Sequence, residues 1–188
     1  MRYSHKLTFA LIVLIFGAGQ AHAVESIECH SGPLPERPGA QVQTSGSVPH
    51  VQVGVKPVKE LNDELIKLAF SLPSLEKRPT IVSLPGAVGM WLGKDVPVAF
   101  PKAIVSGREF AHIHTDGSLH AAFPFKRALE LQRKGWGERH PWADRNEGWQ
   151  GLVMLYSASS ADELSVLIRL VTESYNHVTG QNVLTPGC

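Results

Sequence analysis

Apolar residues recur at spacings of three and four in two long segments of the chain, which is the pattern of helices that bury one face. The first segment runs from Val58 to about Phe70. The second begins at Ser160 or Asp162, either of which can cap the first turn, and ends near Gly180. A shorter segment, Pro124 to Lys134, has proline at its start and is followed by glycine. The pattern therefore predicts three helices.

Stretches of alternating or continuous apolar residues between these helices predict β-strands. We expect strands within Gly86 to Gly93 and Gly151 to Tyr156, and a hairpin from Arg108 to Phe123. Val96 to Val105 also has the pattern of a strand, and its prolines place it at a sheet edge, because proline cannot donate to a neighbouring strand. Strands and helices without a regular βαβ repeat predict an α+β, two-layer domain with an antiparallel sheet and a few packed helices.

Residues 1–23 have the features of a secretory signal peptide. Basic residues precede an apolar run from Leu7 to Ala18, and Ala21-His22-Ala23 is a cleavage pattern. The run is shorter than the roughly 20 residues that span a bilayer, so we expect no membrane contact after cleavage and a periplasmic or secreted protein. Residues 24–56, rich in Gly, Pro, Ser and Gln, are predicted to be an irregular N-terminal arm over the surface, and residues 57–188 a single domain.

Cysteine usage and charge limit the class of protein further. Cys29 and Cys188 would reach an oxidising compartment with the exported chain, so we expect a disulfide between them, the alternative being two unpaired thiols in flexible ends. The 18 basic and 17 acidic residues nearly balance and form no basic cluster, so a nucleic-acid partner is not expected. The pattern leaves the oligomeric state open.

The predicted hairpin contains His112, His114 and His120, and the length of its turn decides which face they share. A two-residue turn would mix histidine with apolar residues on each face. A three-residue loop, Thr115 to Gly117 with a left-handed glycine, sets His112 opposite His120 and His114 opposite Ser118. The second register separates polar from apolar side chains cleanly, and a slip of one residue would exchange the faces. We therefore predict the three-residue loop, with three imidazoles on one patch of the sheet.

Imidazoles this close together have chemical consequences. Three histidines cannot comfortably all be charged, so we expect their pKa values to fall and neutral rings, able to act as bases or metal ligands, to persist near neutral pH. A fourth histidine, His140, lies in Gly135 to Pro141, whose two glycines, tryptophan and proline predict a tight loop. We expect Glu138 or Asp116 to orient an imidazole through its second nitrogen, and Arg139 to hold an anionic or enolate oxygen.

Four short stretches of this region match a known family in their order and spacing. They are Glu109 to His114, Ser118 to His120, Lys134 to Pro141 and Leu155-Tyr156. Together they resemble the luciferase-domain family, which is named for the fungal luciferases and includes many uncharacterised bacterial proteins. The resemblance runs from Arg108 to Gly180, and the positions that match the family pattern are His112, His114, His120, Trp136, Gly137, Arg139, His140 and Tyr156.

The resemblance implies an enzyme that needs no separate cofactor. The fungal members oxidise a hydroxylated pyrone with molecular oxygen, without flavin or nicotinamide, and emit light. Two departures limit what carries over: Tyr156 is followed by Ser-Ala-Ser where many members have Ala-Pro-Arg, and the turn between His114 and Ser118 is shorter than in the fungal enzymes. The N-terminal third does not match the family, and a shared fold alone does not fix the reaction.

The leading hypothesis is a cofactor-independent, oxygenase-like oxidoreductase that acts on a small enolisable or phenolic molecule. One histidine would abstract a proton, and an arginine with the other imidazoles would stabilise the oxyanion. The catalytic candidates are His112, His114, His120, His140, Arg139 and Glu138. The candidate substrate-binding residues are Trp136, Tyr156 and Ser118, with Trp142 and Phe123 as further candidates for an apolar wall.

Two alternatives remain open. The first is a divalent metal site with His112, His114 and His120 as ligands, because neutral imidazoles suit zinc, copper, iron or nickel. Ser118 stands where a cupin usually has glutamate, which argues against that arrangement. The second is a non-catalytic periplasmic protein that binds a small molecule and releases it unchanged.

Overall fold

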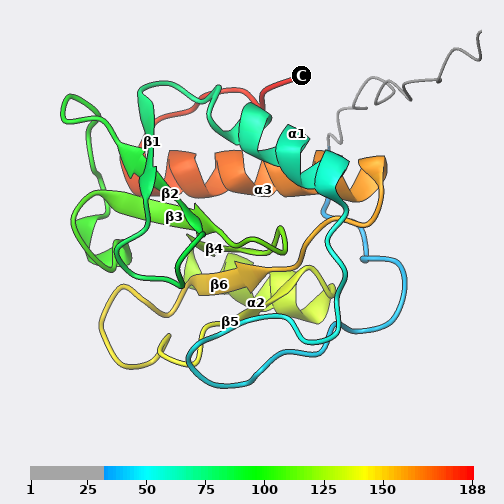
Figure 1. The fold of residues 1–188 in the computed structure, drawn as a ribbon. Helices are drawn as coiled ribbons and strands as arrows, with labels where there is room; N and C mark the ends of the chain where they lie inside the picture. The colour runs from blue at the N-terminus through cyan, green and yellow to red at the C-terminus, as the bar shows by residue number, and fades with distance from the viewer. Residues whose placement is uncertain (1–31) are drawn as a thin grey trace, which may run out of the picture.

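The computed structural model describes residues 32–188 and shows a six-stranded antiparallel sheet with three α-helices (Figure 1). The strands lie in the order β1-β2-β3-β4-β6-β5. This arrangement confirms the predicted two-layer α+β class. In chain order the elements are α1 (Lys59–Ala69), β1 (Leu75–Pro79), β2 (Val88–Leu92), the 3-10 helix η1 (Pro101–Ala103), β3 (Glu109–Ile113), β4 (Leu119–Ala122), α2 (Phe125–Arg133), β5 (Gly137–Arg139), β6 (Leu152–Leu155) and α3 (Ala161–Thr179).

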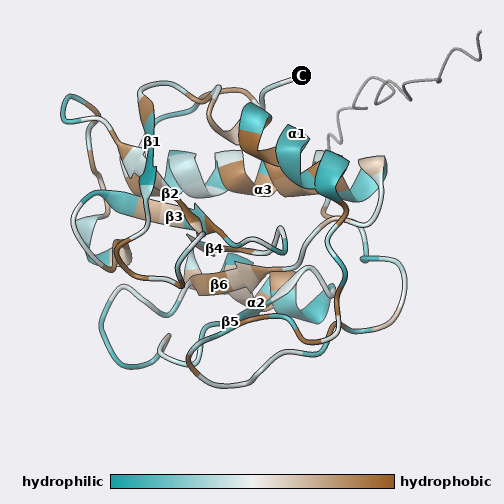
Figure 2. Ribbon diagram, in the orientation of Figure 1, coloured by the Kyte–Doolittle hydropathy of each residue, from teal (hydrophilic) through white to brown (hydrophobic). Residues whose placement is uncertain are grey.

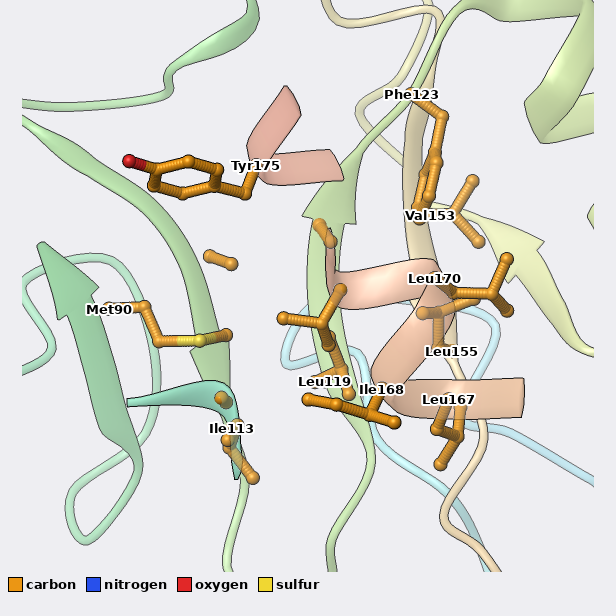
Figure 3. Close-up of a cluster of buried hydrophobic side chains, with 14 of the residues drawn as sticks. Met90, Ile113, Leu119, Phe123, Val153, Leu155, Leu167, Ile168, Leu170 and Tyr175 are labelled. Atoms are coloured by element: carbon orange, nitrogen blue, oxygen red, sulfur yellow. The ribbon is translucent and has the colours of Figure 1, made fainter. Parts of the chain in front are cut away.

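The hydrophobic core lies between one face of the sheet and α3, with α1 packed beside α3 (Figure 1). Leu119 of β4 and Leu155 of β6 are fully buried and lie close to Leu167 and Ile168 of α3 (Figure 3). Truncating a leucine in such a core to alanine costs about 2 to 5 kcal/mol. The hydrophilic residues of α1 point away from α3 (Figure 2). This packing holds the sheet rigid and leaves its opposite face available for other side chains.

Most of the predicted elements form at the expected places. The predicted helices correspond to α1, α2 and α3, and the predicted strands at 86–93 and 151–156 correspond to β2 and β6. Ser160 caps α3 by accepting a hydrogen bond from the backbone N–H of Glu163 (3.2 Å), and Gly180 ends that helix with a left-handed φ of 73°. Periodicity and capping residues therefore suffice to place these elements.

Two sequence-based predictions of elements near the sheet edges are wrong, and one edge strand lacks the alternation of apolar residues that would have predicted it. Val96 to Val105 is not a strand but contains η1, with Pro101 at its first position, where the ring fixes a helical φ. Gly137 to Arg139, predicted as part of a tight loop, is the edge strand β5, because its residues pair with β6. The other edge is β1, whose sequence LEKRP is mostly exposed and does not alternate.

The hairpin of β3 and β4 has the predicted three-residue loop. His112 pairs with His120, the backbone N–H of His114 donates to the carbonyl of Ser118 (2.8 Å), and the N–H of Gly117 donates to the carbonyl of His114 (3.0 Å). Gly117 has a φ of 82°, a left-handed conformation that glycine adopts without steric cost. The register therefore sends the three histidines to the sheet face opposite α3.

The arm formed by residues 32–57 runs past β5 and β6 and covers this histidine face (Figure 1). Thr44 and Gln52 form an isolated bridge within it. His50 and Gln52 are buried, whereas Val53 is 52 % exposed. Gln52 Nε2 donates a hydrogen bond to Asp116 of the hairpin loop (3.2 Å). Polar residues of the arm face the sheet because polar partners there satisfy their hydrogen bonds.

Two predictions concern residues that the structure does not describe. The signal peptide, residues 1–23, lies outside the described range, and so does Cys29, so its disulfide with Cys188 stays a prediction. Within residues 32–188, no helix has the length and apolar character needed to cross a membrane.

Candidate functional site

A cavity of about 540 Å³ lies between the histidine face of the sheet and the arm. Its other walls come from the loop after β1, the segment around η1 and the loop after β5. The lining is mostly apolar, and among residues 32–188 no lysine or arginine contributes to it. The polar side chains that reach the cavity are those of Ser83, Glu109, His50, His112, His114, His120 and His140. All four histidines that the sequence singled out therefore surround one cavity, together with a fifth.

Three of these histidines lie on the hairpin. The ring centroids of His112 and His114 are 5.0 and 4.9 Å from that of His120, and 5.2 Å from each other. All three side chains are buried. Burial, and then the neighbouring His112 and His114 rings, hold the pKa of His120 well below its usual value, because a charged ring here would lose water and meet like charge. His120 is therefore neutral near pH 7.

A buried glutamate orients His112. Glu109 Oε1 accepts hydrogen bonds from His112 Nδ1 (3.1 Å) and from the hydroxyl of Thr80 (2.6 Å), and Oε2 accepts one from the backbone N–H of Ile81 (2.8 Å). Burial opposes ionisation of this carboxyl, but the three hydrogen bonds outweigh it and lower the pKa of Glu109. Glu109 is therefore a carboxylate, and His112 carries a proton on Nδ1.

The position of Glu109 depends on a β-bulge. Residues three apart in a regular strand point to opposite faces, so alternation alone separates Glu109 from His112. In the pairing with β2, however, β3 advances from Ala111 to Glu109 while β2 advances by one residue, which leaves Phe110 as the extra residue. The bulge returns Glu109 to the histidine face. No signal in the sequence predicts this bulge.

A second carboxylate orients His114 through a serine. The Ser118 hydroxyl donates to Asp116 Oδ1 (2.7 Å), so its oxygen accepts the hydrogen bond from His114 Nδ1 (2.8 Å). Gln52 of the arm donates to the other oxygen of Asp116 (3.2 Å). Burial and the nearby histidine rings lower the pKa of His114 to about 4, although Asp116 opposes the shift. His114 is therefore neutral, with its proton on Nδ1 and an unprotonated Nε2.

His50 is a site residue that the sequence pattern does not reveal. Its Nδ1 lies 3.1 Å from His120 Nε2, and its Nε2 lies 2.5 Å from Glu138 Oε1. The same carboxylate oxygen accepts a hydrogen bond from the hydroxyl of Thr44 (2.5 Å). Glu138 therefore orients His50 rather than His140. The arm has no periodicity, so nothing in the sequence indicates which of its residues return to the sheet.

His140 completes the group of imidazoles. Its Nδ1 accepts a hydrogen bond from the backbone N–H of Trp142 (3.0 Å), so the neutral ring carries its proton on Nε2. Its ring centroid lies 4.8 Å from that of His120 and 5.2 Å from that of His50. Burial, and then His50 and other nearby basic groups, lower the pKa of His140 to about 4. His140 therefore offers the cavity an N–H donor on an uncharged ring.

Arg139 does not line the cavity. Its Nε donates to the carbonyl of Gln150 (3.0 Å), its guanidinium pairs with Asp144, and its Cζ lies 5.0 Å from the centre of the Phe125 ring. The side chain alternates with its neighbours along β5, so it points away from the partners of Glu138. The structure thus places this arginine apart from the imidazoles that it was expected to assist.

The aromatic candidates are divided between the core and the cavity. Trp136, Tyr156 and Phe123 are buried, and none of them lines the histidine cavity. Trp136 Nε1 donates to the carbonyl of Pro35 (2.7 Å) and so fastens the arm to the domain. Trp142 lines the cavity beside His140. Ser118, expected to bind substrate, is hydrogen-bonded to Nδ1 of His114 and does not line the cavity.

One family model and several curated relatives match parts of this chain. Residues 107–174 match the family model of the luciferase domain. The chain is 28% identical over 166 residues to a luciferase of Armillaria ostoyae, covering 78% of this chain and 61% of the relative. It is 31% identical over 106 residues to a luciferase of Neonothopanus nambi, covering 50% of this chain and 39% of the relative. The chain therefore spans less than two thirds of the length of these relatives, and no solved structure matches it.

The matched range contains most of the polar groups described above. It includes Glu109, His112, His114, Asp116, Ser118, His120, Glu138 and His140, whereas His50 lies outside it. The resemblance that the sequence motifs indicated is confirmed: residues 107–174 match the luciferase domain, and the chain is similar to fungal luciferases.

Proposed function

We propose that this protein is an exported, luciferase-like enzyme that oxidises a small, mostly apolar molecule with an enolic or phenolic hydroxyl, using dioxygen directly. The observation that carries the proposal is the gathering of neutral imidazoles in one apolar cavity. The family match supports it, because the fungal relatives are named luciferases. Export is a proposal from residues 1–23.

The cavity favours one kind of molecule. Its volume of about 540 Å³ lies in the range of small-molecule sites. A carboxylate or phosphate would meet no lysine or arginine in the described lining and would face the ionised Glu109. A flat ring that is neutral in solution avoids both difficulties, and Phe110 and Trp142 offer apolar contact to it. The lack of a lysine or arginine in the described lining and the presence of the ionised Glu109 therefore both favour an uncharged substrate.

His140 is suited to hold the oxygen of such a molecule. Its ring is fixed by the backbone N–H of Trp142, and the proton on Nε2 belongs to a neutral imidazole. A fixed donor in a cavity screened from water stabilises a developing oxyanion better than a mobile one, because it need not reorient during the reaction. In this proposal His140 takes the role first expected of Arg139, whose guanidinium is engaged elsewhere.

The hairpin histidines accept the hydroxyl proton. His114 Nε2 is unprotonated near pH 7 and belongs to a ring that lines the cavity, so it is available to accept a proton, although its pKa of about 4 makes it a weak base. The resulting anion is electron-rich, and its ring carbon forms a bond to dioxygen. The substrate gives up two electrons, dioxygen is reduced to the peroxide level, and the terminal oxygen takes the proton back. Substrate and dioxygen thus combine into a hydroperoxide without another reactant.

The proposal is tested by oxygen uptake with a panel of hydroxylated 2-pyrones and catechols. We expect one dioxygen consumed per molecule of the accepted substrate. His140→Ala should lower kcat by about 10²- to 10³-fold, the usual loss for one oxyanion donor. His177→Ala is the matched control, because that ring stacks on Phe100 away from the cavity. A molecule that binds tightly and is released unchanged would identify a binding protein and contradict the proposal.

A further inference from the structure

We propose that His112, His114 and His120 bind one divalent first-row transition-metal ion at the floor of the cavity, through His112 Nε2, His114 Nε2 and His120 Nδ1. Each of these buried rings offers a nitrogen atom within 4.8 Å of the others. The proposal goes beyond the oxidation described above, because it concerns binding and needs no substrate. Proximity alone fits either a metal site or a set of hydrogen-bonded rings, and the position of each proton separates the two.

The protons on His112 and His114 are held on the side away from the other rings. Glu109 accepts the Nδ1 proton of His112, and Ser118 accepts the Nδ1 proton of His114 because its own hydroxyl proton goes to Asp116. A neutral imidazole has one N–H, so Nε2 of each ring carries a lone pair. Two nitrogen atoms that face the cluster are therefore ready to bind a cation.

The arm fixes the proton of His120 in the same way. Glu138 Oε1 lies 2.5 Å from His50 Nε2, and a His50 ring whose one proton is on Nε2 has an unprotonated Nδ1. That nitrogen lies 3.1 Å from His120 Nε2, which must therefore be the donor. The lone pair of His120 is left on Nδ1. Each of the three rings is thus held by a series of hydrogen bonds that starts at a carboxylate and ends at a lone pair.

With the protons placed in this way, two lone pairs face each other at a distance that favours a cation between them. His112 Nε2 and His120 Nδ1 are 2.9 Å apart, and two unprotonated nitrogens repel at that separation. A proton shared by this pair would leave the lone pair of His114 Nε2 without a partner. A divalent ion accepts all three lone pairs at once and supplies positive charge opposite the carboxylates that hold the three rings.

The neighbouring group His50, His120 and His140 does not qualify as a second site, although its ligand atoms are equally close. His140 Nδ1 accepts from the backbone N–H of Trp142, so its Nε2 is protonated and cannot bind a metal. His50 Nδ1 is already occupied by the proton of His120 Nε2. Within residues 32–188, His112, His114 and His120 are therefore the one set of three histidines that can bind the ion.

The partners of the ligands indicate the class of metal. Metal-binding histidines commonly donate their second N–H to a carboxylate or another acceptor, which fixes the ring and makes the ligand more basic. Three neutral imidazoles suit zinc, copper, iron, cobalt or nickel, and three protein ligands leave a position open toward the cavity. One consequence rests on the proposed function: with an ion bound, His114 Nε2 would be a ligand and no longer a base, and the ion would itself favour loss of the substrate's hydroxyl proton.

The test is a titration of the untagged protein, stripped with a chelator, with Co²⁺ and Zn²⁺. Calorimetry should give one ion per chain, and bound Co²⁺ should show visible absorption that reports its coordination. Ser118→Ala removes only the partner of His114 and should weaken binding about 10- to 100-fold. His114→Gln should weaken it at least as much. His140→Gln and His177→Gln should bind as tightly as the unaltered protein, because neither side chain supplies a ligand.

The outcomes separate this proposal from the proposed oxidation. Absence of stoichiometric binding by both ions, or equal weakening by His140→Gln and His114→Gln, would overturn the metal site. Oxygen consumption by the stripped protein would then leave the oxidation standing. Stoichiometric metal without any oxygen consumption would instead support the site and contradict the oxidation. Circular dichroism of each variant checks folding, and Ser118→Ala keeps the test decisive if His114→Gln does not fold.

Discussion

Replacing Gly117 with alanine tests whether the hairpin loop is built as described. The residue has a φ of 82°, a conformation that costs an L-amino acid about 1 to 2 kcal/mol. A Cβ would also lie 1.9 Å from Oδ1 of Asn62 in α1, so that side chain must rotate away, at about 0.5 to 1.5 kcal/mol. Alanine lowers the entropy of the unfolded chain, which returns about 0.4 to 1 kcal/mol. We therefore expect Gly117→Ala to lower the free energy of unfolding by about 2 kcal/mol.

A second glycine provides the matched control. Gly135 has a φ of 77°, close to that of Gly117, but a Cβ there would meet its nearest neighbour, Arg37 Cβ, at an ordinary 3.6 Å. Gly135→Ala therefore carries the backbone cost without the displaced side chain, about 1 kcal/mol. The difference between the two variants measures the contact between the loop and α1. In an Asn62→Ala background this difference should disappear.

Urea unfolding followed by circular dichroism gives both free energies by linear extrapolation. The slopes should agree among the variants, so that the midpoints alone report the change in stability. Equal midpoints for Gly117→Ala and Gly135→Ala in the unaltered background would refute the close approach of Asn62. A Gly117→Ala protein as stable as the parent would refute the left-handed loop itself, and with it the register that gathers the histidines.

Three further predictions concern pH, Trp136 and Arg139. The pKa values of His114 and His140 drop from 6.5 to about 4 on folding, so between these values the unfolded chain binds more protons than the folded chain. The free energy of unfolding of the metal-free protein should therefore decrease as the pH falls from 6.5 to 4. The decrease should be shallower for His140→Gln, which removes one of the two shifted groups. A free energy of unfolding that does not change with pH would contradict both pKa shifts. Trp136→Phe should lower the free energy of unfolding by about 1 kcal/mol through loss of its hydrogen bond with KM unchanged, whereas a raised KM would place the ring at the substrate. Arg139→Met should change kcat by no more than about twofold, because its partner Asp144 is exposed and such pairs contribute little; a hundredfold loss would return Arg139 to the reaction.

The hairpin could be predicted because its own sequence contains the information that folds it. Four apolar positions and three histidines separate onto two faces in one register only, and Gly117 supplies the turn. The same holds for α3, whose first and last residues carry their own caps at Ser160 and Gly180. Where neighbours in sequence are also neighbours in space, pattern and structure agree.

Glu109 and His50 could not be predicted for a shared physical reason. The face of Glu109 depends on a bulge created in the pairing with β2, and the position of His50 depends on contacts with residues seventy or more positions away. Neither the bulge nor these long-range contacts produce a periodic pattern in the sequence. β1 and β5 escaped for a related reason, because edge strands need no alternation of apolar residues.

Positions shared with a family do not reveal by themselves whether they serve the fold or the reaction. Gly137 matches the family pattern, and a Cβ there would lie 2.3 Å from the carbonyl oxygen of Met154, so the glycine permits β5 to pair with β6. Trp136 fastens the arm, and Arg139 is occupied at the sheet edge. Only the histidines combine a family position with a place in the cavity lining.

The arm and the sheet contribute different properties to the cavity. Residues 48–51 form a wall in contact with any occupant, while the proton-exchanging groups stand on the sheet. A change of Val48, Pro49 or Val51 that keeps His50 would alter the shape offered to incoming molecules yet leave the basic nitrogens of the hairpin where they are. Substrate preference can therefore change without a change in the hairpin residues. A fragment that contains only residues 107–174 would lose both this wall of the cavity and His50.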